Sequence, residues 1–146
     1  MVDRNRGAAA DPPALLFFAF RALTAEPDRV LAERGLSRVH HRVLYFVGRD
    51  PGVRVGGLLA TLGVSKQALN RPLRELLRLG LVVATAPALN RRARELRLTA
   101  EGERLERRLS AAQRRRFARA FAAAGPAAEQ GWREVMARLA EPGGRR

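Results

Sequence analysis

The stretch from residue 55 to residue 99 limits the possible folds most, because two short segments with apolar faces meet at a glycine turn. Three leucines give the first segment its apolar face: Leu58, Leu59 and Leu62. Gly63 follows, and glycine readily adopts the positive φ that ends a helix sharply. Ser65 then offers a side chain suited to cap the next helix. The stretch therefore predicts a helix, a tight turn and a second helix.

The second segment has the spacing of an amphipathic helix that ends at Gly80. Leu69, Leu73 and Leu76 recur at intervals of four and three, which places them on one helical face. In a helix-turn-helix, the second helix enters the major groove of DNA with its N-terminal residues near base edges. Lysine and arginine donate to guanine there, and glutamine and asparagine pair with adenine. We predict DNA contacts from Ser65, Lys66, Gln67, Asn70, Arg71 and Arg74.

Two short strands around a basic loop follow this helix. Leu81, Val82 and Val83 open one strand, and alternation of Leu96 and Leu98 indicates another. Residues 88–94 form the basic tip between them, and residues 53–55 are suited to a short strand that pairs with this hairpin. We predict that the tip follows the DNA backbone or minor groove through Arg91, Arg92 and Arg94. For the whole stretch 55–99, the alternative is a small helical hairpin with a solvated basic face.

The segment from Gly35 to Leu109 resembles the MarR group of bacterial winged-helix transcription regulators. Four motifs carry the resemblance: Leu36-Ser37, Leu62-Gly63-Val64-Ser65-Lys66, Arg78-Leu79-Gly80-Leu81-Val82 and Leu98-Thr99-Ala100-Glu101-Gly102. In the wing, Asn90 stands where the family pattern has Asp, and Arg92 keeps its Arg. The resemblance implies a homodimer on a pseudo-palindromic duplex, with recognition helices about one turn, roughly 34 Å, apart. It also implies control by a small-molecule effector.

The expected fold class is mainly α with a small β wing (α+β), in five segments. Residues 1–10 are expected to be a disordered tail, and residues 141–146 a loose one. Residues 11–35 form an N-terminal dimerisation segment, with Asp11 as cap and an interruption or kink at Glu26-Pro27-Asp28. Residues 36–100 form the winged helix-turn-helix, in which Pro72 should bend the second helix. Residues 101–140 form C-terminal dimerisation helices, broken at Gly125-Pro126.

Two apolar segments of the chain predict the dimer independently of the resemblance. The segment from Leu15 to Leu23 is apolar almost all round, so we expect it to be covered on every side. The last helix carries Trp132, Val135, Met136 and Leu139 on one side. We expect this helix to pack against the first helix of a second copy.

Composition narrows the class of protein. The 146 residues carry 28 Lys and Arg against 14 Asp and Glu, a net charge of +14, with Lys66 as the only lysine. This charge favours a polyanionic partner, and an architectural protein that binds nucleic acid without sequence preference remains the alternative. The absence of cysteine excludes disulfides and zinc-thiolate sites. No membrane-spanning run or signal-peptide pattern is present, so we expect a cytoplasmic protein without a membrane partner.

The chemistry of the side chains argues against an enzyme. Adjacent histidines on a helix point about 100° apart, so His40 and His41 are poor partners in one metal site, and neither a metal nor another cofactor is expected. The effectors of the resembled family often bind close to this helix. We therefore predict an effector pocket lined by His40, His41 and Tyr45. The alternative is that a histidine caps a helix or packs at the subunit junction.

Overall fold

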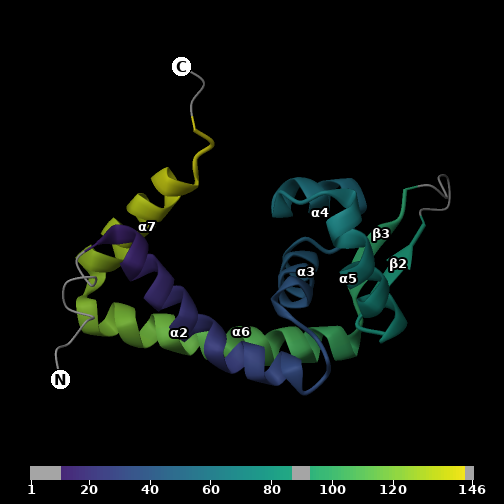
Figure 1. Cartoon of the computed structure of the whole chain (residues 1–146), viewed down its shortest axis with the longest axis horizontal. Helices are drawn as coiled ribbons and strands as arrows, with labels where there is room; N and C mark the ends of the chain where they lie inside the picture. The colour runs from purple at the N-terminus through teal and green to yellow at the C-terminus, as the bar shows by residue number, and fades with distance from the viewer. Residues whose placement is uncertain (1–10, 87–92, 144–146) are drawn as a thin grey trace. The chain divides into compact units, whose positions relative to one another are not determined.

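The computed structural model describes residues 11–86 and 93–143, which form six helices and a three-stranded sheet. In chain order the elements are α2 (Pro12–Ala32), α3 (Arg38–Arg49), β1 (Val53–Arg54), α4 (Val55–Leu62), α5 (Lys66–Arg78), β2 (Val82–Thr85), β3 (Glu95–Leu98), α6 (Ala100–Ala124) and α7 (Pro126–Ala140) (Figure 1). The predicted class, mainly α with a small β wing, is confirmed. The chain divides into two compact units, Met1–Ala112 and Gln113–Arg146, and α6 contributes to both.

Of the interruption or kink expected at Glu26-Pro27-Asp28, the interruption is wrong, because α2 continues through Pro27. A proline inside a helix lacks the N–H of one backbone hydrogen bond. Here the Pro27 ring is fully buried, and burial of its apolar surface offsets part of that loss. Asp11 occupies the predicted N-cap position, yet its side chain makes no cap hydrogen bond. The two prolines that follow it have no N–H to offer at the first two positions of the helix.

The helix-turn-helix of the first unit has the predicted turn and caps. α4 ends at Gly63, whose φ of 63° is in the left-handed region. The Ser65 hydroxyl accepts a hydrogen bond from the Ala68 amide at 3.1 Å and so caps α5. The predicted face of α5, formed by Leu69, Leu73 and Leu76, is buried. The cap sets where α5 begins, and the buried leucines set which side of the helix faces solvent.

The C-terminal end of α5 is fastened to the start of α6. The Leu81 amide bonds to the Leu76 carbonyl at 3.0 Å, and Gly80 adopts a φ of 71°, a helix-ending motif that satisfies the last carbonyls. The Thr99 hydroxyl donates to the Gly80 carbonyl at 2.6 Å and accepts from the Gly102 amide at 3.0 Å. Thr99 therefore caps α6, and it also holds α5 in place.

Gly102 permits this junction to be tight. A Cβ atom at Gly102 would lie 1.9 Å from the carbonyl oxygen of Leu81. Backbone atoms in that position cannot move aside as a flexible side chain would. The start of α6 therefore depends on a residue without a side chain.

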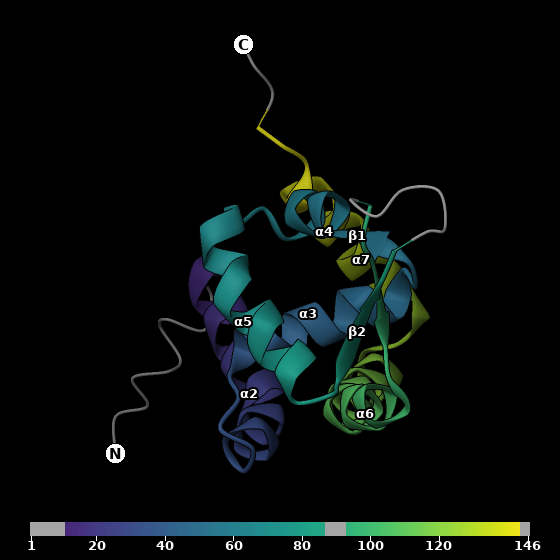
Figure 2. The same ribbon diagram turned by 90° about the vertical axis from the view of Figure 1, so that its right-hand side faces the viewer.

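The sheet is antiparallel with the strand order β1-β3-β2. β1 is the predicted extra strand, although Val55 already belongs to α4, and Val53 pairs with Leu96. On the other side of β3, β2 pairs with it, and Val82 lies opposite Leu98. Buried side chains from the sheet and from α3, α4, α5 and α6 form one apolar core. Figure 2 shows α3 between α5 and the strands.

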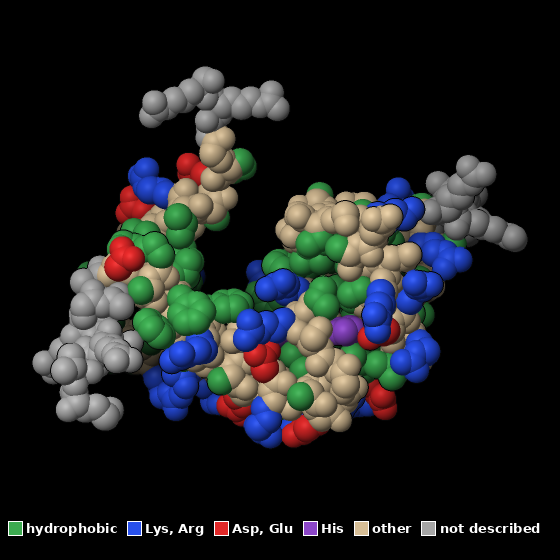
Figure 3. All heavy atoms as spheres, viewed as in Figure 1, with side chains coloured by type: hydrophobic (Ala, Val, Ile, Leu, Met, Phe, Trp, Pro, Cys, Tyr) green, Lys and Arg blue, Asp and Glu red, His purple; other side chains and the backbone are tan. Residues whose placement is uncertain are grey.

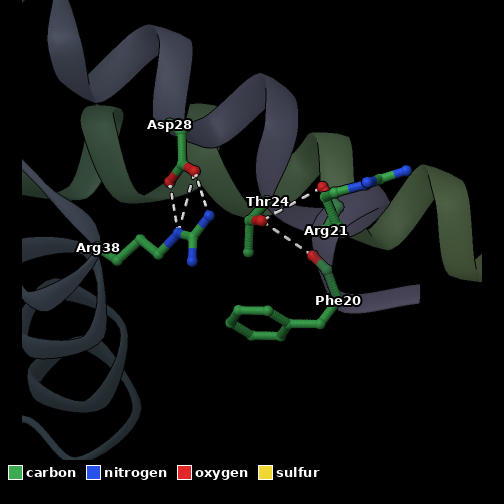
Figure 4. Close-up of polar contacts among 5 residues, drawn as sticks. All are labelled: Phe20, Arg21, Thr24, Asp28 and Arg38. Atoms are coloured by element: carbon green, nitrogen blue, oxygen red, sulfur yellow. Dashed lines mark hydrogen bonds and ion pairs between the residues drawn. The ribbon is translucent and has the colours of Figure 1, made fainter. Parts of the chain in front are cut away.

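The end of α2 is joined to the start of α3 by a charged contact. The Arg38 guanidinium makes two hydrogen bonds of 3.0 and 2.8 Å to one carboxylate oxygen of Asp28 (Figure 4). The same guanidinium lies 5.3 Å from the centre of the Phe20 ring. Nearby, the Thr24 hydroxyl donates to the Phe20 carbonyl at 2.9 Å. This joint connects the proposed dimerisation segment with the helix-turn-helix.

The second unit is organised around three aromatic rings. The ring centroids of Phe117 and Phe121 lie 5.3 and 5.4 Å from that of Trp132, which joins the end of α6 to α7. The break predicted at Gly125-Pro126 is present, because α6 ends at Ala124, α7 begins at Pro126, and Gly125 between them has a φ of 95°. Among the residues that the structure describes, no helix is long and apolar enough to cross a membrane.

Candidate nucleic-acid interface

The side of α5 turned away from its leucines is exposed and basic. All six residues predicted to contact DNA from this region are exposed: Ser65, Lys66, Gln67, Asn70, Arg71 and Arg74. The helix carries four cations and a single acid, Glu75. Figure 3 shows Lys and Arg side chains gathered over α5 and the neighbouring strands. This face combines hydrogen-bonding side chains with positive charge, which is the chemistry of a major-groove contact.

Pro72 lies inside α5, yet the helix is continuous from Lys66 to Arg78. The proline ring faces the core and is buried with the three leucines. Because proline has no N–H, the backbone bond to the Ala68 carbonyl is lost near the start of the exposed face. Pro72 therefore belongs to the packing face of the helix, while the predicted DNA contacts occupy the other face.

A chain of polar contacts connects this face to the core. The Arg71 Nε donates to Glu75 Oε1 at 3.0 Å, and Glu75 Oε2 lies 3.0 Å from His40 Nε2. The Ser37 amide donates to His40 Nδ1 at 3.0 Å. Hydrogen bonds from Arg71 and, next, from His40 hold the pKa of Glu75 below its ordinary value. The carboxylate is therefore ionised near neutral pH and accepts from both sides.

The predicted effector residues differ in their surroundings. His40 is buried and completes the N-terminal cap of α3 with Ser37, so both of its ring nitrogens have partners. His41 is partly buried, and burial lowers its pKa against the opposing charge of Glu106. Tyr45 is also partly buried and packs edge-on against the neighbouring Phe46 ring. The capping role considered as an alternative describes His40, and the effector pocket stays a prediction.

Two hollows on the first unit lie away from the predicted effector residues. One, of about 380 Å³, is lined by Val47, Gly48, Pro51, Arg97, Leu98, Glu103, Glu106 and Arg107. The other, of about 450 Å³, is lined by Asp28, Leu36, Ser37, Arg38 and Val39. Neither hollow includes the two histidines or Tyr45 in its lining. In the described part of the chain, no group of three or more His, Asp or Glu is placed to hold a metal ion.

The tip of the wing lies mostly outside the described residues. Arg91 and Arg92 fall in that gap, as does Asn90, so their predicted roles stay predictions. Arg94 is described and is exposed just before β3. The structure thus brings Arg94 onto the hairpin that flanks α5.

Two residues of this region were missed from the sequence. Arg78 is exposed and follows Arg74 by four residues, so the helical spacing that selected Arg71 and Arg74 would have found it too. Glu75 is the second residue, and it is the single acid among the cations of α5. Its contact with His40 joins residues 35 positions apart, and no local pattern indicates such a pairing.

Comparison with known proteins identifies the family. A model of the MarR family matches residues 34–93. The HTH-type transcriptional regulator PetP of Rhodobacter capsulatus is 47% identical over 131 residues, which cover 90% of this chain and 79% of PetP. The chain belongs to the MarR family. As a MarR-type helix-turn-helix regulator of transcription, it is a DNA-binding protein and not an enzyme.

Solved structures share the fold of this chain. A MarR-family protein of Mycobacterium tuberculosis in complex with salicylic acid is 27% identical, with a TM-score of 0.61 over 89% of this chain and 96% of that one. CouR from Rhodococcus jostii, bound to p-coumaroyl-CoA, is 24% identical, with a TM-score of 0.74 over 97% of this chain and 99% of its own. At that identity, the likeness to CouR speaks for the fold alone.

Proposed function

We propose that this MarR-family protein is a sequence-specific regulator that binds a pseudo-palindromic operator as a homodimer. The observation that carries the proposal is the exposed face of α5, where Gln67 and Asn70 offer amide groups among cations. Amide side chains discriminate bases in the major groove, whereas charge alone gives affinity without sequence choice. Such a regulator acts on the chromosome, in the cytoplasm of a bacterial cell.

Exposed apolar residues support the homodimer. In the first half of α2, Leu15 and Phe17 are 50% and 59% exposed, and in α7 Val135 and Leu139 are 62% and 65% exposed. On each of the two helices, exposed large apolar side chains are typical of an interaction surface. We assign residues 11–35 and 101–140 to dimerisation and residues 36–100 to DNA binding. We propose a second copy of the chain as the partner, because it is present wherever the protein is made.

We further propose control by a small-molecule effector. The Mycobacterium tuberculosis relative was solved with salicylic acid, which makes aromatic carboxylic acids the first probes to test. An effector changes DNA affinity only if it binds the two states of the dimer differently. His41 and Tyr45 remain our candidates to line its pocket, together with His40. A thermal shift with salicylate, repeated in His40→Ala and His41→Ala, tests this assignment, and unchanged shifts in both variants would remove it.

The proposed DNA contacts are tested by selecting bound duplexes from a random pool. We expect a recurrent, two-fold related half-site. Gln67→Ala and Asn70→Ala should then relax base preference, whereas Arg94→Ala should weaken binding to all sequences and reduce the salt dependence. Recovery of no preferred sequence would instead identify an architectural protein, the role that the net charge of +14 alone would support.

A further inference from the structure

We propose that Glu75 is a positioning residue for DNA recognition, which holds the Arg71 guanidinium in the orientation that reads a guanine edge. The inference rests on the proposed function, because it requires the exposed face of α5 to enter the major groove. It assigns a part in sequence preference to a carboxylate and a histidine that lie behind the DNA-contacting side chains.

The contact between Arg71 and Glu75 leaves the arginine able to bind DNA. The side chain of Arg71 is 87% exposed, and that of Glu75 is 28% exposed. Their 3.0 Å bond uses the Nε–H, one of the five N–H donors of a guanidinium. The two terminal amino groups remain for other acceptors, and arginine binds guanine O6 and N7 through two such donors. Glu75 thus fixes the Nε end of the Arg71 guanidinium and leaves its two terminal amino groups for a base.

The carboxylate is itself fixed from the buried side. The Ser37 amide donates to His40 Nδ1, so that nitrogen carries no proton and the neutral ring carries it on Nε2. This Nε2–H donates to Glu75 Oε2 at 3.0 Å. His40 is 6% exposed, so the ring is held by its surroundings. The position of Glu75 is therefore set by α3 and not only by its own helix.

This support distinguishes the pair from an ordinary surface ion pair. Exposed pairs four residues apart in a helix contribute little, because both long side chains lose freedom when they meet. Glu75 has already lost its freedom in the bond to His40. Only Arg71 has freedom left to lose, so its orientation is held more firmly than that of an arginine with a mobile partner.

Glu75→Gln separates the two bonds of this carboxylate. Glutamine has nearly the shape of glutamate but offers one oxygen and one amino group. Because the Ser37 amide fixes the tautomer of His40, the oxygen of the new amide must face His40 Nε2–H. The amino group then faces the Arg71 Nε–H, and two donors cannot bond. The variant should keep the contact with the core and release Arg71.

The test is a double-mutant cycle on the duplex recovered by selection, on copies of it with one base pair changed, and on a random duplex. We expect Glu75→Gln to lower the discrimination at one base pair about tenfold. Affinity for the random duplex should be unchanged or higher, because a negative charge near phosphate is removed. In an Arg71→Ala background, Glu75→Gln should have no further effect on discrimination. Arg74→Ala is the matched control, in which the full effect of Glu75→Gln should persist.

Five results would overturn the inference. Equal weakening of the selected and random duplexes would indicate a merely structural carboxylate, and equal strengthening would indicate that Glu75 only neutralises Arg71. Persistence of the tenfold change without Arg71 would exclude action through that side chain. If Arg71→Ala itself leaves binding unchanged, the proposed α5 contact with DNA is wrong. If Arg71→Ala matters and Glu75→Gln does not, only the positioning role is lost.

Discussion

The winged helix and the two terminal helical segments place their apolar side chains in opposite ways. In the winged helix, Leu44, Leu69 and Leu96 are at most 1% exposed, and polar contacts hold the ends of the helices. In the first half of α2 and in α7, large apolar side chains face outward, as with Phe17 and Leu139. The winged helix therefore has its own core, whereas the first half of α2 and α7 leave large apolar side chains exposed. The difference agrees with our proposal that the winged helix reads DNA and the terminal segments form the dimer.

The same substitution at two glycines gives the largest contrast. Gly102→Ala would place a Cβ atom 1.9 Å from the Leu81 carbonyl oxygen, so we expect a loss of about 3 kcal/mol or more in the free energy of unfolding. Gly131→Ala in α7 meets nothing within 4 Å and should be neutral or stabilise by up to about 1 kcal/mol. Urea denaturation measures both. Similar losses of unfolding free energy in the two variants would contradict the difference in packing between the winged helix and α7.

A charge on the apolar side of α7 should separate the protomers. Leu139→Asp would bury a carboxylate in the proposed dimer interface, and we expect the dimer dissociation constant to rise at least about a hundredfold. Ala137→Asp adds the same charge on the far side of the helix and is the control. Sedimentation velocity over a range of concentrations measures the effect. A wild-type protein that is monomeric throughout would refute the assembly.

The N-cap of the recognition helix provides a smaller effect. Ser65→Ala removes the acceptor of the Ala68 amide and should cost about 1 kcal/mol of stability. Ser65→Asp keeps an acceptor there and should restore stability, yet it should weaken DNA binding because its charge faces phosphate. Thermal unfolding and DNA titration of both variants separate the two roles. Parallel changes in stability and affinity would show that Ser65 only caps the helix.

The smallest effect concerns pH. Burial holds the pKa of folded His41 below its ordinary value of 6.5. As the pH falls from 6.5 toward the lowered pKa, the unfolded chain takes up a proton that the folded chain does not, so stability should decrease. His41→Gln should flatten this part of the stability profile. An identical slope in the variant would show that another group is responsible.

Local patterns predicted the parts of the fold whose causes are local. Gly63 ends α4 and Ser65 caps α5 as the residue types indicated, since caps and turns depend on a few neighbouring residues. Local patterns left both a kink and an interruption open at Pro27, because burial of a proline ring depends on the packing of distant segments. The close approach at Gly102 was missed for the same reason.

In the candidate site, too, local patterns predict some features, and only the packing of the helices creates others. The exposed face of α5 follows from helical periodicity, and every residue predicted on it is exposed. The link from Arg71 through Glu75 to His40 joins α5 to α3, and only the packing of the two helices creates it. The predicted wing contacts of Arg91 and Arg92 lie outside the described residues and await DNA-binding measurements.

We propose that two copies of α5, held in one dimer, read two half-sites. A measurement of DNA affinity against the spacing of the half-sites tests this arrangement. We expect tightest binding when half-site centres are about 10 base pairs apart. An insertion of about 5 base pairs, half a turn of DNA, should lower affinity to that for a single half-site. Leu139→Asp should bind weakly at every spacing. Equal affinity of the wild-type protein for all spacings and for random duplex would refute binding to two half-sites by one dimer.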